Sequence, residues 1–247
     1  MLISTILFSI VIVKIWRWSP FLAVPLVGLF LIVDLAFFAA TITKVAHGGW
    51  FPLVAGISIF VLLMTWKRGR DLLFTRLKEE AIPTTTFLNS LSSDVVRVRG
   101  TAVFLTATAD GVPHALLHNM KHNQVVHERV VFLTVVTEDI AHVADDARIS
   151  IQHLGRRFYR VILRYGYNDA TDIPAAFKLG KDHGLEIDNM TTSYFLGRET
   201  LIPSAHPGMA LWREGVFAWM SRMSTTAMDF FMLPPNRVVE LGTQIEI

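Results

Sequence analysis

Four histidines lie close together in the second half of the chain, at His114, His118, His122 and His127. If a helix begins at Pro113, the first three are spaced four residues apart and share one helix face. Three such side chains spread over roughly 12 Å at the α-helical rise, too far to bind one metal ion together. His118 and His122 could act as two zinc ligands. The alternative, which we favour, is that they are polar residues of a helix surface or interface, so we assign no metal site.

A hydrolytic triad could be assembled from Ser204, His206 and Asp229, which have the required side-chain types. No G-x-S-x-G sequence surrounds Ser204, so the signature of an exposed nucleophile is missing. The segments 197–200 and 208–212 contain glycine but lack the spacing of a phosphate-binding or dinucleotide-binding loop. We therefore expect no enzyme activity, with no catalytic residue, no cofactor-binding residue and no cofactor.

Asp34 is the acidic residue of an otherwise apolar N-terminal region. A carboxylate at membrane depth is costly and faces protein or water. Two interpretations stay open: Asp34 is an ion or proton relay group, or it is an inward-facing partner of a neighbouring helix. We favour the helix partner.

The elements that carry these residues fall into a membrane part and a soluble part. Residues 21–43 are long enough for a spanning helix, and 50–66 lie near the lower limit with Trp at both ends. Residues 2–18 are interpreted as the last part of a spanning helix, anchored by Lys14 to Trp18; a signal-peptide core is the alternative, but no basic residue precedes it. Gly48, Gly49 and Pro52 predict a tight turn followed by a helix start.

Lys and Arg residues predict the orientation of these segments. Lys14 and Arg17 follow the first segment, and Lys67, Arg68 and Arg70 follow the third. Loops that are rich in basic residues stay in the cytoplasm. The C-terminal domain is therefore expected to be cytoplasmic.

The pattern of apolar residues in the soluble part predicts an α/β domain with a mixed sheet. The predicted strands are 101–106, 129–137, 149–151, 158–165, 192–196 and 238–241, and the predicted helices are 71–80, 113–122, 173–183 and 212–228. The first strand, helix and second strand read as a βαβ unit with a parallel pair. The expected organisation is membrane segments in 1–66, a helical linker in 67–97 and a cytoplasmic domain in 98–247.

Composition excludes several function classes. The net charge is only +2, and basic and acidic residues are equally numerous after residue 66, so the basic field that nucleic acid requires is missing. Cysteine is absent, which excludes disulfides, thiolate metal sites and cysteine nucleophiles.

Several strings, in order along nearly the whole chain, resemble the Kup-type potassium uptake permeases. They are GGWFP at 48–52, TWKRGR at 65–70, VRGTAVFLT at 98–106, LHNMKHN at 117–123, HERVV at 127–131, RYGY at 164–167 and PNRVVELG at 235–242. The resemblance implies a multi-pass, proton-coupled potassium symporter of the inner (plasma) membrane, with an APC-type (LeuT-like) helical core.

The resemblance also implies that this chain is the C-terminal portion of such a transporter. Family members have about twelve membrane helices, and their potassium site is expected in the earlier helices. We therefore assign no ion ligand here, and we expect the chain alone not to transport. The partners implied are potassium ions and protons in the complete transporter, the lipid bilayer and the missing N-terminal helices.

The C-terminal domain is expected to have a regulatory or assembly role. The predicted helix 212–228 contains Trp212, Phe217 and Trp219, a large apolar surface that either forms a homodimer interface or fills the domain core. The alternative function for the whole chain is a membrane-tethered cytoplasmic enzyme or small-ligand sensor.

Overall fold

The computed structural model divides the chain into two compact units, Met1–Met64 and Thr65–Ile247. It describes residues 1–45, 48–79, 81–92, 95–107, 111–180, 184–185, 187–188, 190–202 and 208–246. Helix α3 (Trp50–Glu79) contributes residues to both units.

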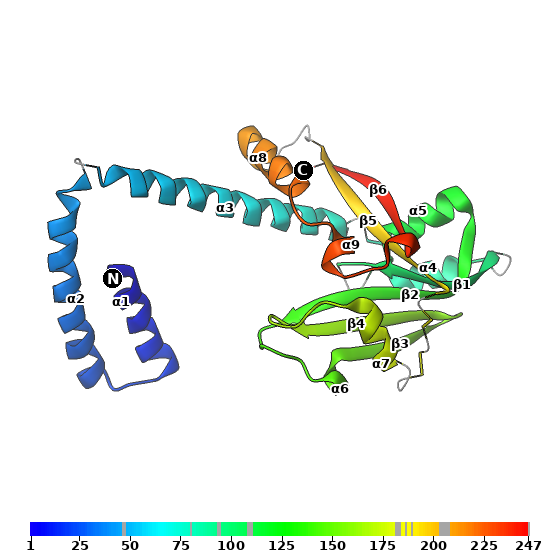
Figure 1. Ribbon diagram of the computed structural model, residues 1–247, viewed down its shortest axis with the longest axis horizontal. Coiled ribbons are helices and arrows are strands. Elements are labelled where there is room, and N and C mark those ends of the chain that lie inside the picture. Colours follow the sequence, from blue (N-terminus) through cyan, green and yellow to red (C-terminus); the bar gives the residue numbers. More distant parts are fainter. Residues whose placement is uncertain are drawn as a thin grey trace. The chain divides into compact units, whose positions relative to one another are not determined.

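The first unit is helical (Figure 1). Helix α1 (Leu2–Ile10) continues into a π-helical turn (Val11–Ile15), and α2 (Pro20–Ile42) packs beside α1. Proline begins α2, where a missing N–H has no consequence for the helical hydrogen bonds. The predicted turn is present: Gly48 has φ +118°, a conformation that suits glycine, and α3 begins two residues later.

Two helices of the described chain, α2 and α3, are long and apolar enough to cross a membrane. Their large apolar side chains are mostly exposed, including Phe21, Leu29 and Ile32 of α2 and Ile57, Phe60 and Leu63 of α3. A helix that exposes apolar side chains on all its sides is suited to contact with lipid rather than with water. This is the surface that the predicted spans require.

The second unit contains a six-stranded sheet in the order β3-β4-β2-β1-β5-β6. The strands are β1 (Val96–Leu105), β2 (Val125–Glu138), β3 (Ile149–Gly155), β4 (Phe158–Gly166), β5 (Thr192–Ile202) and β6 (Val238–Glu246). All neighbours pair in parallel except β3, which is antiparallel to β4. The predicted mixed sheet and the parallel β1–β2 pair are therefore confirmed.

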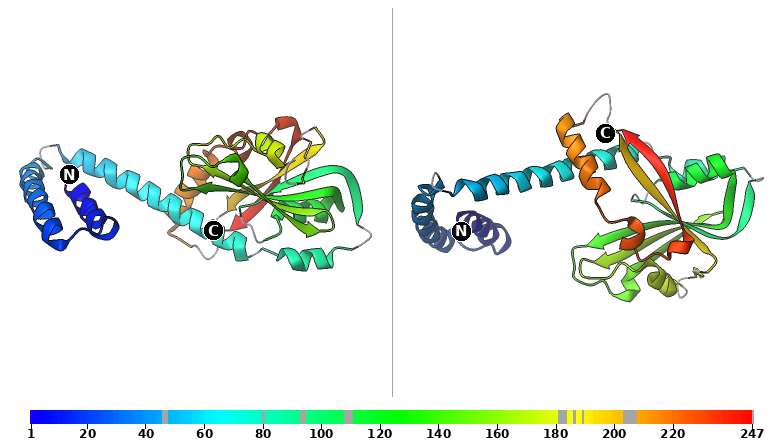
Figure 2. Two further views of the ribbon diagram at one scale, coloured as in Figure 1. Left: turned by 90° about the horizontal axis from the view of Figure 1, so that it is seen from below. Right: turned by 45° about the horizontal axis from the view of Figure 1, so that its top comes forward.

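Helices cover both faces of this sheet (Figure 2). Val103 faces one side, where it shares a core with Phe177 of α7 (Ile173–Leu179). Phe104 faces the other side, with Leu116 of α5 (His114–Asn123). Because both faces are buried, the strands read as continuous apolar runs instead of alternating ones.

The remaining helices are short except for one. They are α4 (Thr84–Ser90), α6 (Asp145–Arg148), α8 (Leu211–Arg222), α9 (Ala227–Phe230) and a 3₁₀ turn at Pro235–Arg237. The expected linker 67–97 contains α4, whose Phe87 is buried in the core against Phe158.

The predicted continuous helix 212–228 is wrong. Helix α8 stops at Arg222, and a separate helix α9 begins after Thr226, whose side chain caps it by accepting from the Asp229 N–H. A threonine that satisfies a free N–H favours a new helix start over continuation of the old one. Apolar content alone did not reveal this break.

Candidate functional site

A cavity of about 410 Å³ opens at the carboxyl end of β1. Strand β1 stops after Leu105, which is aligned with Leu133 of β2, whereas β2 continues to Glu138. On the other side β5 continues to Ile202, well past Phe195, which is aligned with Phe104. The two flanking strands therefore extend beyond β1 with no strand between them.

The cavity lies at the point where the strand order of the sheet reverses. The chain proceeds from β1 to β2 on one side, and β5 lies on the other side of β1. In open α/β sheets, a crevice at the carboxyl ends of the strands forms where the strand order reverses in this way, and ligands bind there. The cavity thus lies where this kind of fold most often places a binding site.

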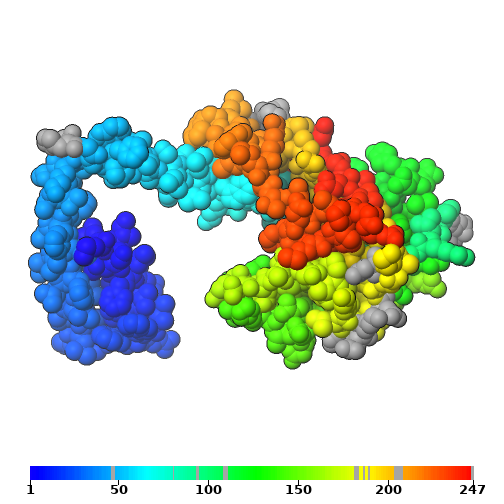
Figure 3. All heavy atoms as spheres, in the orientation of Figure 1, coloured from blue at the N-terminus to red at the C-terminus, as the bar shows by residue number. Residues whose placement is uncertain are grey.

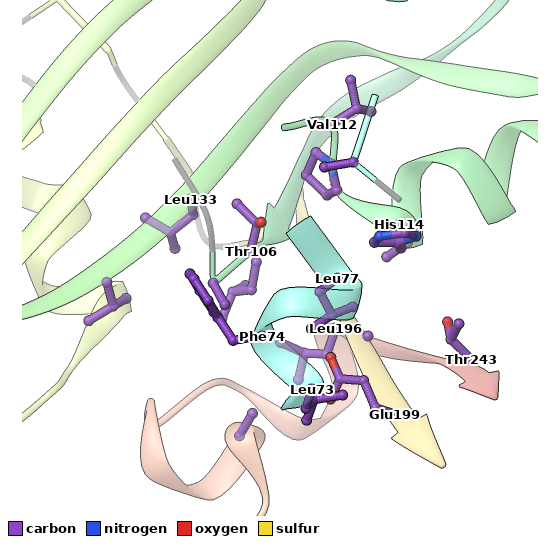
Figure 4. Close-up of a pocket in the computed structure, with 18 of the residues that line it drawn as sticks. Leu73, Phe74, Leu77, Thr106, Val112, His114, Leu133, Leu196, Glu199 and Thr243 are labelled. Carbon is purple, nitrogen blue, oxygen red and sulfur yellow. The ribbon is translucent and has the colours of Figure 1, made fainter. Parts of the chain in front are cut away.

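Most of the cavity wall is apolar (Figure 4). Helix α3 supplies Leu73, Phe74 and Leu77, and the strands supply side chains such as Leu133 and Leu196. Phe74 is 47% exposed although it is a large apolar residue of the second unit. The wall therefore offers apolar contact area that the protein itself leaves partly uncovered.

Among the described residues, the polar ones that line the cavity are Arg70, Thr106, His114, Glu199 and Thr243. The Nε2 atom of His114 is buried and has no hydrogen-bond partner within the described part of the chain. His114 is the first residue of α5, and Pro113 at the N-cap provides no side-chain cap. The partial positive charge of the helix start and the charge of Arg70 from α3 both lie at the cavity wall.

The chemistry of this arrangement is that of binding. An apolar wall with a few convergent polar groups is typical of a small-molecule site. Within the described residues, no three His, Asp or Glu side chains are grouped so that they could hold a metal ion.

The four histidines occupy three different environments. His118 and His122 stack on the surface of α5 with ring centroids 6.1 Å apart, while His114 faces the cavity. His127 lies on β2 with its ring 5.6 Å from that of Phe195, and burial lowers its pKa. The structure therefore does not bring the four together.

The described residues give no support to a hydrolytic triad of Ser204, His206 and Asp229. Ser204 and His206 lie outside them. The Asp229 carboxylate accepts a hydrogen bond of 2.6 Å from the Thr226 hydroxyl at the start of α9. Asp229 therefore has a local capping role.

Helix α8 divides its aromatic side chains between two faces. Phe217 is fully buried, with its ring 5.5 Å from that of Trp66 on α3, in a cluster that includes Leu73 and Ile245. Trp212 and Trp219 are 60% and 57% exposed. The helix thus contributes to the core of its own unit and also presents an apolar outer surface.

In the first unit, Asp34 is buried and has a partner. The Thr5 hydroxyl of α1 donates a hydrogen bond to the Asp34 carboxylate of α2. This contact favours the interpretation of Asp34 as a partner between helices.

Comparison with protein-family models decides the family. Residues 1–71 match the K⁺ potassium transporter integral membrane domain, and residues 99–247 match the K⁺ potassium transporter C-terminal domain. The chain belongs to the K⁺ potassium transporter family. The Kup-type resemblance of the sequence is thereby confirmed.

Curated relatives of this family match along the whole chain. It is 51% identical over 247 residues to a "Probable potassium transport system protein Kup 2" of Rhizorhabdus wittichii, and 53% identical over 247 residues to one of Rhodopseudomonas palustris (strain BisB5). These matches cover 100% of this chain but only 38% and 40% of the two relatives. No solved structure matches the chain.

The sequence did not predict the cavity in the C-terminal domain of this chain. Its elements were predicted, since strand 101–106 and the following helix were both expected. The missing information was the position of β5, which pairs with β1 opposite β2. The separation along the chain between Leu105, which ends β1, and His114, which begins α5, was a local signal of an open strand end.

Proposed function

We propose that this chain is the C-terminal portion of a transporter that carries potassium ions together with protons across the inner membrane. The observation that carries the proposal is the whole-chain similarity to potassium transport system proteins. Residues 1–66 are its late membrane segments, residues 67–97 are a helical linker, and residues 98–247 are a cytoplasmic domain that regulates or assembles the transporter.

The chain does not transport on its own in this proposal. A selective ion path needs a closed set of oxygen ligands between helices, and transporters build it near the bilayer midplane at the interface of two repeats. The described residues contain two long apolar helices and a shorter one, too few to enclose such a path. In this proposal the ion ligands lie outside this sequence, in the remaining part of the complete transporter.

A flux measurement tests the transport proposal. The chain is joined to the upstream helices of a relative, reconstituted into liposomes and supplied with radioactive rubidium as a potassium analogue. We expect rubidium uptake that increases with an inward proton gradient and disappears when a protonophore removes the gradient. Rubidium uptake that does not depend on the proton gradient would reject proton coupling but would still support potassium transport.

The cavity supports a regulatory role for the C-terminal domain through a small ligand. Its apolar wall suits an apolar molecule, while Arg70, His114 and the start of α5 favour one anionic group on that molecule. Glu199 of β5 also lines the cavity, and its negative charge disfavours a second anionic group nearby. A sensor domain was also the alternative function that the sequence left open.

The absence of cysteine from this chain permits a sharp test of that role. Thr243→Cys places a thiol in the cavity, and a bulky maleimide attached there would occupy it. We expect this modification to change rubidium uptake by the completed transporter. Thr75→Cys, on an exposed position of α3 that does not line the cavity, is the control. Equal uptake by both labelled variants and the unlabelled protein would contradict a regulatory cavity.

Assembly through a homodimer remains a separate proposal for this domain. Stable protein interfaces bury about 800 Å² on each partner. Sedimentation of the full chain in detergent, across a range of protein concentrations, tests the dimer: a mass of one copy at every concentration would reject it.

A further inference from the structure

Helix α8 has an outer face that the rest of its unit leaves uncovered. Leu211, Trp212, Trp219 and Met223 are 57–70% exposed. Leu211, Trp219 and Met223 follow one another at helical intervals of eight and four residues, so they form one apolar stripe. In the space-filling view α8 (orange) lies at the surface of its unit (Figure 3).

The inner face of the same helix fixes its position along α3. Arg213 donates from Nε to the Thr65 hydroxyl at 3.0 Å, and Phe217 packs against Trp66. A Cβ atom added to Gly69 would lie only 2.4 Å from the Phe217 ring, so α8 approaches the α3 backbone directly at this glycine. Helix α8 is therefore held against the segment Thr65–Gly69.

This segment begins where the apolar part of α3 ends. Lys67 and Arg68 are the first charged residues after the apolar stretch. Thr65–Gly69 spans about 6 Å along the helix axis at 1.5 Å per residue. The polar interfacial layer of a bilayer is roughly 5–8 Å thick on each side of the hydrocarbon. If α3 crosses the membrane, α8 is held at the depth of that layer.

The chemistry of α8 suits this depth. Tryptophan is enriched at membrane interfaces because its ring combines a large apolar surface with a polar N–H. Arg222 of α8 and the neighbouring Lys67 and Arg68 of α3 are exposed and positively charged. Interfacial helices combine an apolar face with such cations, which attract the anionic headgroups of the cytoplasmic leaflet.

We propose that α8 is an interfacial helix whose outer face, Leu211, Trp212, Trp219 and Met223, lies on the lipid surface of the cytoplasmic leaflet. The proposal rests on the proposed function in one respect, namely that α3 crosses the bilayer. The helix then attaches the C-terminal domain to the membrane beside the last span. Its contacts with Thr65 and Gly69 couple the position of the domain to that of α3.

A second copy of the chain fits the outer face less well. Helix α8 has 12 residues, so it is about 18 Å long and its exposed face covers roughly 200 Å² at a width near 10 Å. A stable dimer needs about 800 Å² on each copy. Attachment to lipid grows with the buried apolar area and the attraction of cations to anionic headgroups, and needs no matching protein face. The lipid surface is already present at the end of the span.

Spin labels on introduced cysteines test the proposal in the full chain, reconstituted in liposomes that contain anionic lipid. The labelled variants are Trp219→Cys on α8, Ile57→Cys on the apolar part of α3 and Tyr167→Cys, an exposed aromatic residue far along the chain from α8. Collision with oxygen, which concentrates in lipid, is compared with collision with a neutral nickel complex, which stays in water. Near-native melting of each labelled variant shows that the fold is kept.

We expect oxygen to dominate at positions 57 and 219 and the nickel complex to dominate at position 167. If position 57 reports lipid but position 219 reports water, the interfacial helix is rejected while the span remains. Protection of position 219 from both reagents would show that protein covers the face, as in a dimer, and would also overturn the proposal. If position 57 itself reports water, the membrane placement of α3 fails.

Discussion

At the residue scale, the hydrogen-bond partner of Asp34 favours one of its two possible roles. The sequence showed a carboxylate in an apolar helix, and the structure shows that Thr5 donates a hydrogen bond to it from the neighbouring helix. This hydrogen bond gives the buried side chain a partner on the neighbouring helix, as buried polar groups usually have.

A variant of this residue separates the two roles. In the completed transporter, Asp34→Asn keeps an oxygen that can accept the Thr5 hydroxyl hydrogen, so we expect rubidium uptake to be retained. A proton relay would lose its titrating group in the same variant. Abolished uptake, with normal amounts of protein in the membrane, would show that Asp34 takes part in coupling.

Asp169 is a residue whose structural importance the sequence did not reveal. Its carboxylate accepts hydrogen bonds from the N–H groups of Val143 and Gly166 and lies 2.7 Å from His142 Nδ1. These bonds join the chain segments that follow β2 and β4. Gly166 also has no room for a side chain, because a Cβ atom there would meet the Ala141 carbonyl oxygen at 2.2 Å.

The pKa of Asp169 predicts a pH dependence of stability. The backbone hydrogen bonds from Val143 and Gly166, followed by the bond with His142, hold this pKa well below its usual range. Because the folded pKa lies below the unfolded value of about 3.9, the carboxylate stabilises the fold above that pH and loses this effect as the pH falls further. We expect Asp169→Asn to lower the melting temperature at pH 7, with a difference from wild type that shrinks below about pH 4.

Thermal unfolding of the full chain in detergent, followed at several pH values, measures this effect. Asp145→Asn is the matched control, since Asp145 makes an exposed ion pair with Arg148, which contributes little to stability. A difference between wild type and Asp169→Asn that is the same at pH 7 and pH 3 would contradict the assigned role.

At the element scale, the strands were more predictable than the spatial order that makes the cavity. The apolar runs at 101–106 and 129–137 identified β1 and β2, because a strand buried on both faces needs such residues throughout. The break between α8 and α9 coincides with a local capping residue, Thr226, which the apolar pattern of 212–228 does not take into account. The pairing of β5 with β1 depends on contacts between distant segments, so no local pattern shows it.

The contact between α3 and α8 predicts a stability effect. Gly69→Val would force side-chain atoms into the Phe217 ring and separate the helices, at a cost of about 1–3 kcal/mol in the free energy of unfolding. Gly215→Ala in α8 is the control, because a Cβ atom there meets nothing within 4 Å. Chemical denaturation monitored by tryptophan fluorescence measures both. Equal stability of Gly69→Val and wild type would show that α8 is not packed on α3.

At the scale of the whole molecule, the basic residues after the last apolar segment predict on which side of the membrane the C-terminal domain lies. Lys67, Arg68 and Arg70 follow the apolar part of α3, and an excess of basic residues beside a span favours the cytoplasmic side. Alkaline phosphatase, which is active only outside the cytoplasm, is fused after Ile247. We expect no phosphatase activity from this fusion, while a fusion at Gly49, between α2 and α3, should be active. Strong activity of the C-terminal fusion would overturn the orientation.

In the proposed function, this chain is one part of a potassium transporter and does not move ions alone. The most direct measurement is growth at low potassium of cells that lack their own potassium uptake systems. We predict no rescue by the 247-residue chain and full rescue when the upstream helices of a relative precede it. Expression-dependent rescue by the chain alone would contradict the account, because the ion path would then have to lie within these residues.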